Sequence, residues 1–143
     1  SDAYKAAIDQ YKNDVAAARM AQWRNRCVSD GYEPGSTFKL ITLASALDSG
    51  AVTLNDSFYC GGQEKFSGRE QILNCWKSAG HGAQSTAQAL GNSCNIAFGH
   101  IGLRMGGDMF YDYLKSFGIM EKTGVDLPGE ASLVTLPVWP FLQ

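Results

Sequence analysis

The stretch YEPGSTFKLITLASALDSG, residues 32–50, decides the fold of this chain. Pro34-Gly35 is a loop signal, and the residues that follow predict a helix from Ser36 to Ser49 that Gly50 ends. Ser36 precedes Lys39 by three positions, so their side chains share one face of the helix start. A lysine can activate a serine hydroxyl when its pKa is lowered enough to leave it partly neutral. Taken alone, Ser-x-x-Lys arises often by chance and favours an ordinary helix start with a solvated lysine.

The composition limits the classes of protein to which the chain can belong. It has 143 residues, 12 Lys plus Arg against 14 Asp plus Glu, 45% hydrophobic residues and 18% charged residues. This is enough to build the core of one domain, or part of one, and it argues against disorder. The net charge of −2 argues against nucleic-acid binding. Apolar runs are broken before membrane-spanning length, so we expect neither a signal peptide nor a membrane anchor within these residues.

The periodicity predicts an α-rich α+β fold. Apolar residues at helical spacing near the N-terminus form a stripe of Tyr4, Ile8, Tyr11, Val15 and Ala18. The expected segments are an N-terminal helix (1–26), the Ser-x-x-Lys helix (27–50), an irregular hairpin excursion (51–82), a helical region (83–118) and an extended tail (119–143). Strands are expected at Ser57 to Cys60 and Gln71 to Trp76, and helices at Ser85 to Leu90, Asn95 to Met105 and Asp108 to Phe117.

A second motif, Ser93-Cys94-Asn95, lies between two of these predicted helices. Ser-x-Asn is the element that penicillin-recognising serine acyltransferases combine with Ser-x-x-Lys. Together with residues 32–39, Asn92 to Asn95 and Thr123 to Glu130, it makes the chain resemble the transpeptidase domain of class B penicillin-binding proteins over roughly residues 20–135. Trp23-Arg24-Asn25 and residues 121–131 resemble the sporulation and division branch of Gram-positive bacteria.

The resemblance implies the helical part of the penicillin-binding protein and serine β-lactamase fold. It implies that Ser36 attacks the D-alanyl-D-alanine amide of a peptidoglycan stem peptide and forms an acyl-enzyme. Lys39 is then the general base, Ser93 relays a proton to the leaving group, and Asn95 binds the peptide amide of the substrate. β-Lactam antibiotics are the second expected ligand. The whole protein is expected to be membrane-anchored and to act outside the cytoplasm.

The third motif of the family is Lys-Thr/Ser-Gly on a strand, and Lys122-Thr123-Gly124 matches its letters. We reject this match because the family's strand lies much further from Ser-x-Asn and does not run into Val-Asp-Leu-Pro-Gly-Glu. Lys122 is therefore expected to be a surface residue before a turn. Most of the central β-sheet is then expected to be absent from these residues, which leaves the catalytic site incomplete. An exposed apolar face is expected to favour oligomers or swapped segments.

Four cysteines, Cys27, Cys60, Cys75 and Cys94, contain no Cys-x-x-Cys pair. Three thiolates and one imidazole form a common zinc site, which Cys60, Cys75, His81 and Cys94 can supply. The resemblance strengthens this assignment, because some elongation-type relatives carry zinc at similar spacings with Asp in place of one Cys. The alternatives are a Cys60–Cys75 disulfide, or thiols packed as small apolar groups. Cys27 is expected to be a free, partly buried thiol, and His100 a packing residue.

The sequence therefore favours one function and leaves two alternatives. The favoured function is a D,D-transpeptidase that cross-links peptidoglycan. The second is a β-lactam sensor that only needs to be acylated, although the Pro-Gly-Ser-Thr-Phe-Lys and Leu-Pro-Gly-Glu stretches resemble the transpeptidase branch. The third is an inert structural piece stapled by zinc. A β-lactamase is disfavoured, because no deacylating base lies beside Ser36 in the sequence.

Overall fold

The structure is a computed structural model that describes residues 2–68 and 70–131. These residues form two compact units, one made of residues 2–32 with 122–131 and the other of residues 33–121. The α-rich α+β class expected from the sequence is confirmed, since helices dominate and the strands are short. Among the described helices, none combines the length and the apolarity needed to cross a membrane.

The first unit contains α1 (Asp2–Gln22) and α2 (Arg26–Ser29). The helical periodicity near the N-terminus therefore predicted the helix correctly, but none of its residues is buried. Tyr4 and Tyr11 of the apolar stripe are each 69% exposed. The side chain of Asn25 caps α2 by accepting a hydrogen bond from the backbone N–H of Cys27 at 3.1 Å. Cys27 itself is exposed, so the expectation of a partly buried thiol was wrong.

Residues 122–131 form a loop in the same unit. The backbone N–H and the hydroxyl of Thr123 both donate to Glu130 Oε1, at 2.6 and 2.7 Å. The Ala131 N–H donates to the Val28 carbonyl at 2.9 Å, which ties the loop to α2. Lys122 is exposed and residues 122–124 form no strand, as expected from the rejected Lys-Thr-Gly match. The tail beyond residue 131 lies outside the described residues.

The second unit holds both candidate motifs. Its elements are a 3₁₀ turn η1 (Gly35–Thr37), α3 (Phe38–Asp48), β1 (Ser57–Cys60), β2 (Gln63–Glu64), β3 (Leu73–Asn74), β4 (Gly82–Ser85), α4 (Thr86–Gly91), α5 (Asn95–Met105) and α6 (Gly107–Ser116). β1 pairs with β4 and β2 pairs with β3, both antiparallel. The expected strand at Gln71 to Trp76 shrinks to β3, and β4 was not predicted because Gly-Ala-Gln-Ser has low strand propensity.

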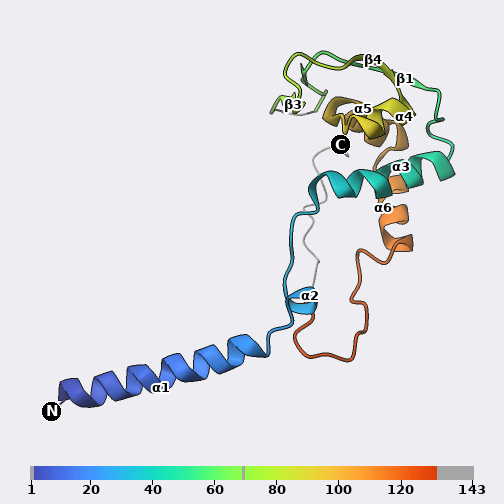
Figure 1. Ribbon diagram of the computed structural model, residues 1–143. Coiled ribbons are helices and arrows are strands. Elements are labelled where there is room, and N and C mark those ends of the chain that lie inside the picture. Colours follow the sequence, from blue (N-terminus) through green and yellow to red (C-terminus); the bar gives the residue numbers. More distant parts are fainter. Residues whose placement is uncertain (1, 69, 132–143) are drawn as a thin grey trace. The chain divides into compact units, whose positions relative to one another are not determined.

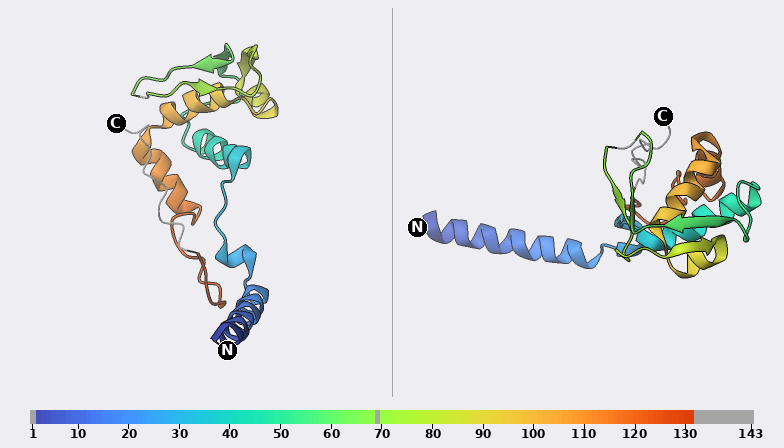
Figure 2. Two further views of the ribbon diagram at one scale, coloured as in Figure 1. Left: turned by 90° about the vertical axis from the view of Figure 1, so that its left-hand side faces the viewer. Right: turned by 90° about the horizontal axis from the view of Figure 1, so that it is seen from above.

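Helix α5 forms the centre of this unit, between α3 and the β1–β4 sheet (Figures 1 and 2). Its inner residues Ile96, Ala97 and Ile101 have no exposed surface. Burial of each isoleucine contributes about 1.5–3 kcal/mol to folding. His100 of the same helix packs between the rings of Phe58 and Phe66, as predicted, and also contacts Glu64 Oε2 at 3.0 Å.

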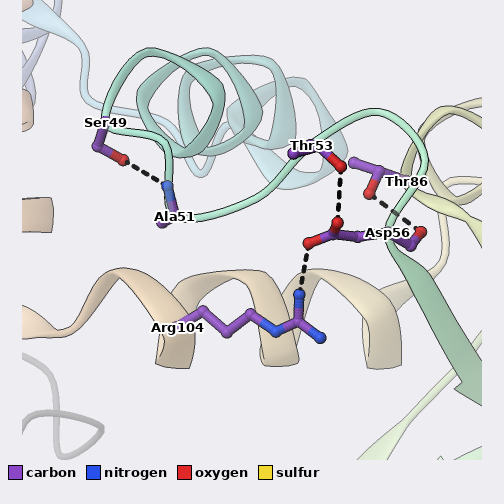
Figure 3. A network of polar contacts seen from close by, with 6 residues as sticks. All are labelled: Ser49, Ala51, Thr53, Asp56, Thr86 and Arg104. Carbon is purple, nitrogen blue, oxygen red and sulfur yellow. Dashed lines mark hydrogen bonds and ion pairs between the residues drawn. The ribbon is translucent and has the colours of Figure 1, made fainter.

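A polar network attaches the segment before β1 to two helices (Figure 3). Arg104 of α5 donates to Asp56 Oδ2 at 2.7 Å, and Thr53 donates to Asp56 Oδ1 at 2.6 Å. The backbone carbonyl of Asp56 accepts from the N–H of Thr86 at the start of α4, at 2.9 Å. The network therefore fixes the position of α4 on α5, and the Ser-x-Asn motif lies between these two helices.

Candidate active site and metal centre

The two sequence motifs meet in the second unit. Ser36 lies in η1 and Lys39 in the first turn of α3, so both side chains project from the same end of one helix. Ser93 follows the C-terminus of α4, and Asn95 begins α5. Chain segments more than fifty residues apart in sequence therefore contribute to one cluster.

Lys39 Nζ is the centre of that cluster. It lies 3.3 Å from Ser36 Oγ and 3.0 Å from Ser93 Oγ, and it donates to the Ser93 carbonyl at 2.7 Å and to Asn95 Oδ1 at 2.6 Å. The Ser93 hydroxyl donates to Ser36 Oγ at 3.1 Å, which closes a triangle of two hydroxyls and one amine. Every member of this triangle is within hydrogen-bond distance of the other two, which is the reach that proton transfer needs. All four predicted catalytic residues come together here.

The surroundings of Lys39 shift the pKa of its amine. Burial lowers the pKa of the Lys39 amine, because an ammonium loses hydration in the half-buried site. The electrostatic influence of the Cys75 and Cys94 sulfurs acts in the opposite direction and raises it. Burial is the larger effect, so the net pKa shift is downward, as a lysine base requires.

Ser93 has an unusual backbone conformation. Its φ is +48°, and no other described non-glycine residue has a positive φ. The Ser93 N–H donates to the Leu90 carbonyl at 2.9 Å and the Cys94 N–H to the Ala89 carbonyl at 3.0 Å. These two bonds are the Schellman arrangement that ends a helix, in which glycine normally occupies the left-handed position. A serine there costs roughly 1–2 kcal/mol, so the site keeps a hydroxyl at the expense of stability.

The second predicted site also comes together. The ligand atoms of Cys60, Cys75, His81 and Cys94 all lie within 4.8 Å of one another. Cys75 Sγ lies 4.0 Å from Cys94 Sγ and 3.6 Å from His81 Nδ1. A tetrahedral zinc ion with bonds of about 2.0–2.3 Å separates its ligands by about 3.6–3.8 Å. The spacing and the donor set therefore fit zinc, and all four cysteines are free.

Within the described part of the chain, one polar atom of this cluster lacks a hydrogen-bond partner, and two of its thiols differ in the direction of their pKa shifts. His81 Nε2 is buried without a hydrogen-bond partner among the described residues. Burial raises the pKa of the Cys94 thiol to about 11. At Cys75 burial is the largest single effect and opposes ionisation, but hydrogen bonds from the backbone of Lys77 and Asn95 and from the Cys60 and Cys94 thiols together lower the pKa of this thiol. A buried set of this kind is expensive to leave without a ligand.

Two glycines let the chain cross itself beside the cysteine cluster. A Cβ on Gly80 would lie 2.2 Å from the Cys60 carbonyl oxygen, and one on Gly62 would lie 2.0 Å from the Ser78 carbonyl oxygen. Both residues have positive φ, +76° and +94°. The close approach brings Cys60 and His81 to the same place, and no other residue fits at either position.

Sequence reasoning missed the segment that supports the Ser-x-Asn loop. The Asn74 carbonyl accepts from Asn95 Nδ2 at 2.9 Å, and Trp76 Nε1 donates to the Asn92 carbonyl at 2.8 Å. Both contacts join residues that are at least sixteen positions apart, and one partner in each is a backbone carbonyl. The one signal in the sequence that could have indicated the role of Trp76 is its position directly after Cys75, a candidate metal ligand.

Comparisons with known proteins identify the family of this chain. The family model for the penicillin binding protein transpeptidase domain matches residues 3–140. Stage V sporulation protein D of Bacillus subtilis is 45% identical over 116 residues, which are 80% of this chain and 18% of that protein. Peptidoglycan D,D-transpeptidase MrdA of Acinetobacter baumannii is 34% identical, covering 80% of this chain and 17% of that protein. Penicillin-binding protein A of Mycobacterium tuberculosis, solved as a ceftriaxone acyl-enzyme complex, superposes with a TM-score of 0.62 at 34% identity, over 66% of this chain and 22% of that one.

The fold and these matches define a chain of the penicillin-recognising class. More particularly, it belongs to the penicillin-binding protein transpeptidase family. It spans about a fifth of the length of the curated relatives that it matches.

Proposed function

We propose that this chain carries the nucleophile side of a peptidoglycan D,D-transpeptidase site. The observation that supports this most directly is the triangle of Ser36 Oγ, Lys39 Nζ and Ser93 Oγ, with sides of 3.0–3.3 Å. The names of the relatives support the same reaction class, since MrdA is a peptidoglycan D,D-transpeptidase.

In the proposed reaction, neutral Lys39 removes the proton of the Ser36 hydroxyl while Oγ attacks the carbonyl carbon between two D-alanines. The tetrahedral intermediate collapses, the C–N bond breaks, and Ser93 passes the proton from Lys39 to the departing D-alanine amine. The product is an ester on Ser36. An amine of a second stem peptide then attacks this ester, which forms the cross-link and returns the proton to Ser36. Asn95 binds the substrate's peptide amide once its own contact with Lys39 opens.

The whole protein is proposed to work outside the cytoplasm from a membrane anchor, on peptidoglycan stem peptides, and to be acylated by β-lactams. Its similarity to stage V sporulation protein D supports a role in the cell wall made during sporulation.

The test is acylation by a fluorescent penicillin, followed by mass spectrometry of the labelled peptide. We expect a covalent adduct on Ser36 that Ser36→Ala removes and that Ser116→Ala, a change of an exposed serine on α6, leaves intact. With a stem peptide that ends in D-alanyl-D-alanine as the acyl donor, the full-length protein should release D-alanine and transfer the acyl group to an added D-amino acid, whereas a sensor would not. An adduct that survives Ser36→Ala contradicts the proposal.

We further propose that Cys60, Cys75, His81 and Cys94 hold a structural zinc ion. The ion would supply folding free energy by joining the excursion to the Ser-x-Asn loop. The four-atom cluster and the three buried, free thiols within it support this assignment. Native mass spectrometry should show one zinc per chain that a chelator removes and that Cys60→Ser prevents. A mass lower by two hydrogens, without metal, would indicate the Cys60–Cys75 disulfide instead.

A further inference from the structure

Three consecutive residues hold the Ser-x-Asn loop from one side. Asn74 accepts from the Asn95 side chain through its carbonyl, the Cys75 and Cys94 sulfurs lie 4.0 Å apart, and Trp76 donates to the Asn92 carbonyl. Residues 74–76 therefore contact residues 95, 94 and 92 in reverse order. This segment begins with Asn74, the last residue of β3, and β3 lies against α5 (Figure 1).

The contact made by Trp76 is directed at the strained turn. In the Schellman arrangement at the end of α4, the carbonyls of Asn92 and Ser93 receive no bond from the helix itself. Trp76 Nε1 donates to the first at 2.8 Å, and Lys39 Nζ donates to the second at 2.7 Å. The carbonyls of the two peptide units that flank the left-handed Ser93 therefore each accept a hydrogen bond from one side chain. One of these two side chains is Lys39, the candidate base.

The indole ring itself is poorly protected. Trp76 is 67% exposed, and its described ring contact is with His81, at 5.4 Å between centroids. Burial of apolar surface therefore explains little of its placement. The hydrogen bond to Asn92 and the contact with His81 are the interactions that hold the ring beside the loop.

We propose that Trp76 is a positioning residue for the acylation of Ser36, a role that rests on the proposed function. Its indole N–H holds the Asn92 carbonyl, which keeps Ser93 in the left-handed conformation and directs the Ser93 hydroxyl at Ser36 and Lys39. Trp76 touches neither the nucleophile nor the base, so its effect on the reaction passes through Ser93.

The test compares Trp76→Phe with Trp23→Phe. Phenylalanine keeps an aromatic ring against His81 but has no N–H, and Trp23 is a second exposed tryptophan, at 83%, in the other unit. For Trp76→Phe we expect acylation at saturating benzylpenicillin to slow by about 3- to 10-fold, the net value of one hydrogen bond. The concentration for half-saturation should change less than the rate, and Trp23→Phe should leave both unchanged. A wild-type acylation rate in Trp76→Phe overturns the proposal.

Hydrogen exchange provides a readout that does not depend on the reaction. In Trp76→Phe the N–H groups of Ser93 and Cys94 should exchange faster, whereas those of Ser49 and Gly50 at the end of α3 should not. In the unmutated chain the indole N–H of Trp76 should exchange more slowly than that of Trp23. If the unmutated chain is not acylated, the proposed function fails for it. The exchange rates then still decide whether Trp76 holds the turn at Ser93. Equal exchange of the two indole N–H groups, or unchanged exchange at Ser93 and Cys94 in Trp76→Phe, overturns the proposed role of Trp76.

Discussion

Ser93 shows how one residue can serve chemistry at a cost in stability. Its hydroxyl donates to Ser36 Oγ at 3.1 Å, yet its φ of +48° is disfavoured for any residue with a Cβ. Glycine would relieve the strain but has no hydroxyl. Strain of this kind is typical of functional sites and depends on surrounding contacts that hold the residue in place.

Ser93→Gly and Ser93→Ala should therefore separate strain from chemistry. Both remove the hydroxyl, but only alanine keeps a Cβ in the left-handed region. We expect Ser93→Gly to have a free energy of unfolding about 1 kcal/mol higher than Ser93→Ala, measured by urea denaturation. Both variants should be acylated at least tenfold more slowly than the unmutated chain. Equal stability of the two variants would contradict the strained conformation.

Lys39 predicts the pH dependence of the proposed acylation. A lysine base acts only when neutral, so the rate should rise with pH and level off above the pKa of Lys39. Burial lowers that pKa. The pH at which the rate is half-maximal should therefore lie below the ordinary lysine pKa of about 10.4. The check is a pH series of acylation rates, with Lys39→Arg as the control. Arginine stays charged and should abolish acylation throughout the range; a rate that instead falls as pH rises excludes Lys39 as the base.

At the scale of elements, the helix ends place the candidate site. Ser85 and Gln88 form a capping box at the start of α4, with bonds of 3.2 and 2.8 Å. Its C-terminal Schellman turn then leads directly into α5 through Cys94 and Asn95. Helix α4 is only six residues long, so its N-terminal cap and its C-terminal turn involve most of its residues. These two end structures therefore determine where Ser93 lies.

Ser85→Ala tests this dependence. The variant loses the hydroxyl that accepts from the Gln88 N–H, so the free energy of unfolding should fall by about 1 kcal/mol. Thermal unfolding followed by circular dichroism measures the loss. Ser57→Ala, opposite Ser85 in the β1–β4 pair, serves as the control and should change stability much less. Equal losses in both variants would mean that the cap contributes nothing specific.

The chain crossing beside the cysteine cluster makes a sharper prediction. Gly80→Ala places a Cβ against the Cys60 carbonyl, whereas Gly82→Ala has the same sign of φ, +69°, and nothing within 4 Å. Both variants bear backbone strain of about 1 kcal/mol. Only Gly80→Ala also forces apart the two chain segments that cross at Gly62 and Gly80. Gly80→Ala should therefore unfold at a clearly lower urea concentration and bind zinc more weakly. Indistinguishable unfolding of the two variants would argue against the close approach.

At the scale of the molecule, each of the two compact units has its own internal contacts. The second unit contains every candidate catalytic residue and metal ligand, with α5 as its core. The first unit exposes the apolar stripe of α1, and the expected tendency to oligomerise stays a prediction.

Zinc should stabilise the second unit as a whole. A ligand that binds only the folded state at a hundred times its dissociation constant adds about 2.7 kcal/mol. We expect zinc to raise the thermal midpoint and a chelator to lower it again. Cys60→Ser should abolish this response, and Cys27→Ser, at an exposed thiol outside the cluster, should retain it. A thermal midpoint that does not respond to zinc would contradict the zinc site and would favour packing as the role of Cys60, Cys75 and Cys94.

Local features of the chain could be predicted from its residues. The limits of α5 follow from the apolar spacing of Ile96, Ala97 and Ile101 and from Gly106, because a helix depends on contacts within a few residues. The Ser-x-x-Lys and Ser-x-Asn motifs are equally local, so the four candidate catalytic residues could be chosen from the sequence. The ligand set was chosen in the same way, with help from the family resemblance.

The contacts between distant groups, by contrast, follow from the folded arrangement of the chain. β4 lacks strand-forming side chains and exists because β1 pairs with it, and the stripe of α1 stays exposed although its pattern predicts a buried face. The left-handed Ser93, the crossing of Gly62 and Gly80, and the bond from Trp76 to Asn92 leave no local pattern. Each of them depends on the close approach of segments or on backbone carbonyls, which every residue has, and for this reason residue identity alone does not reveal them.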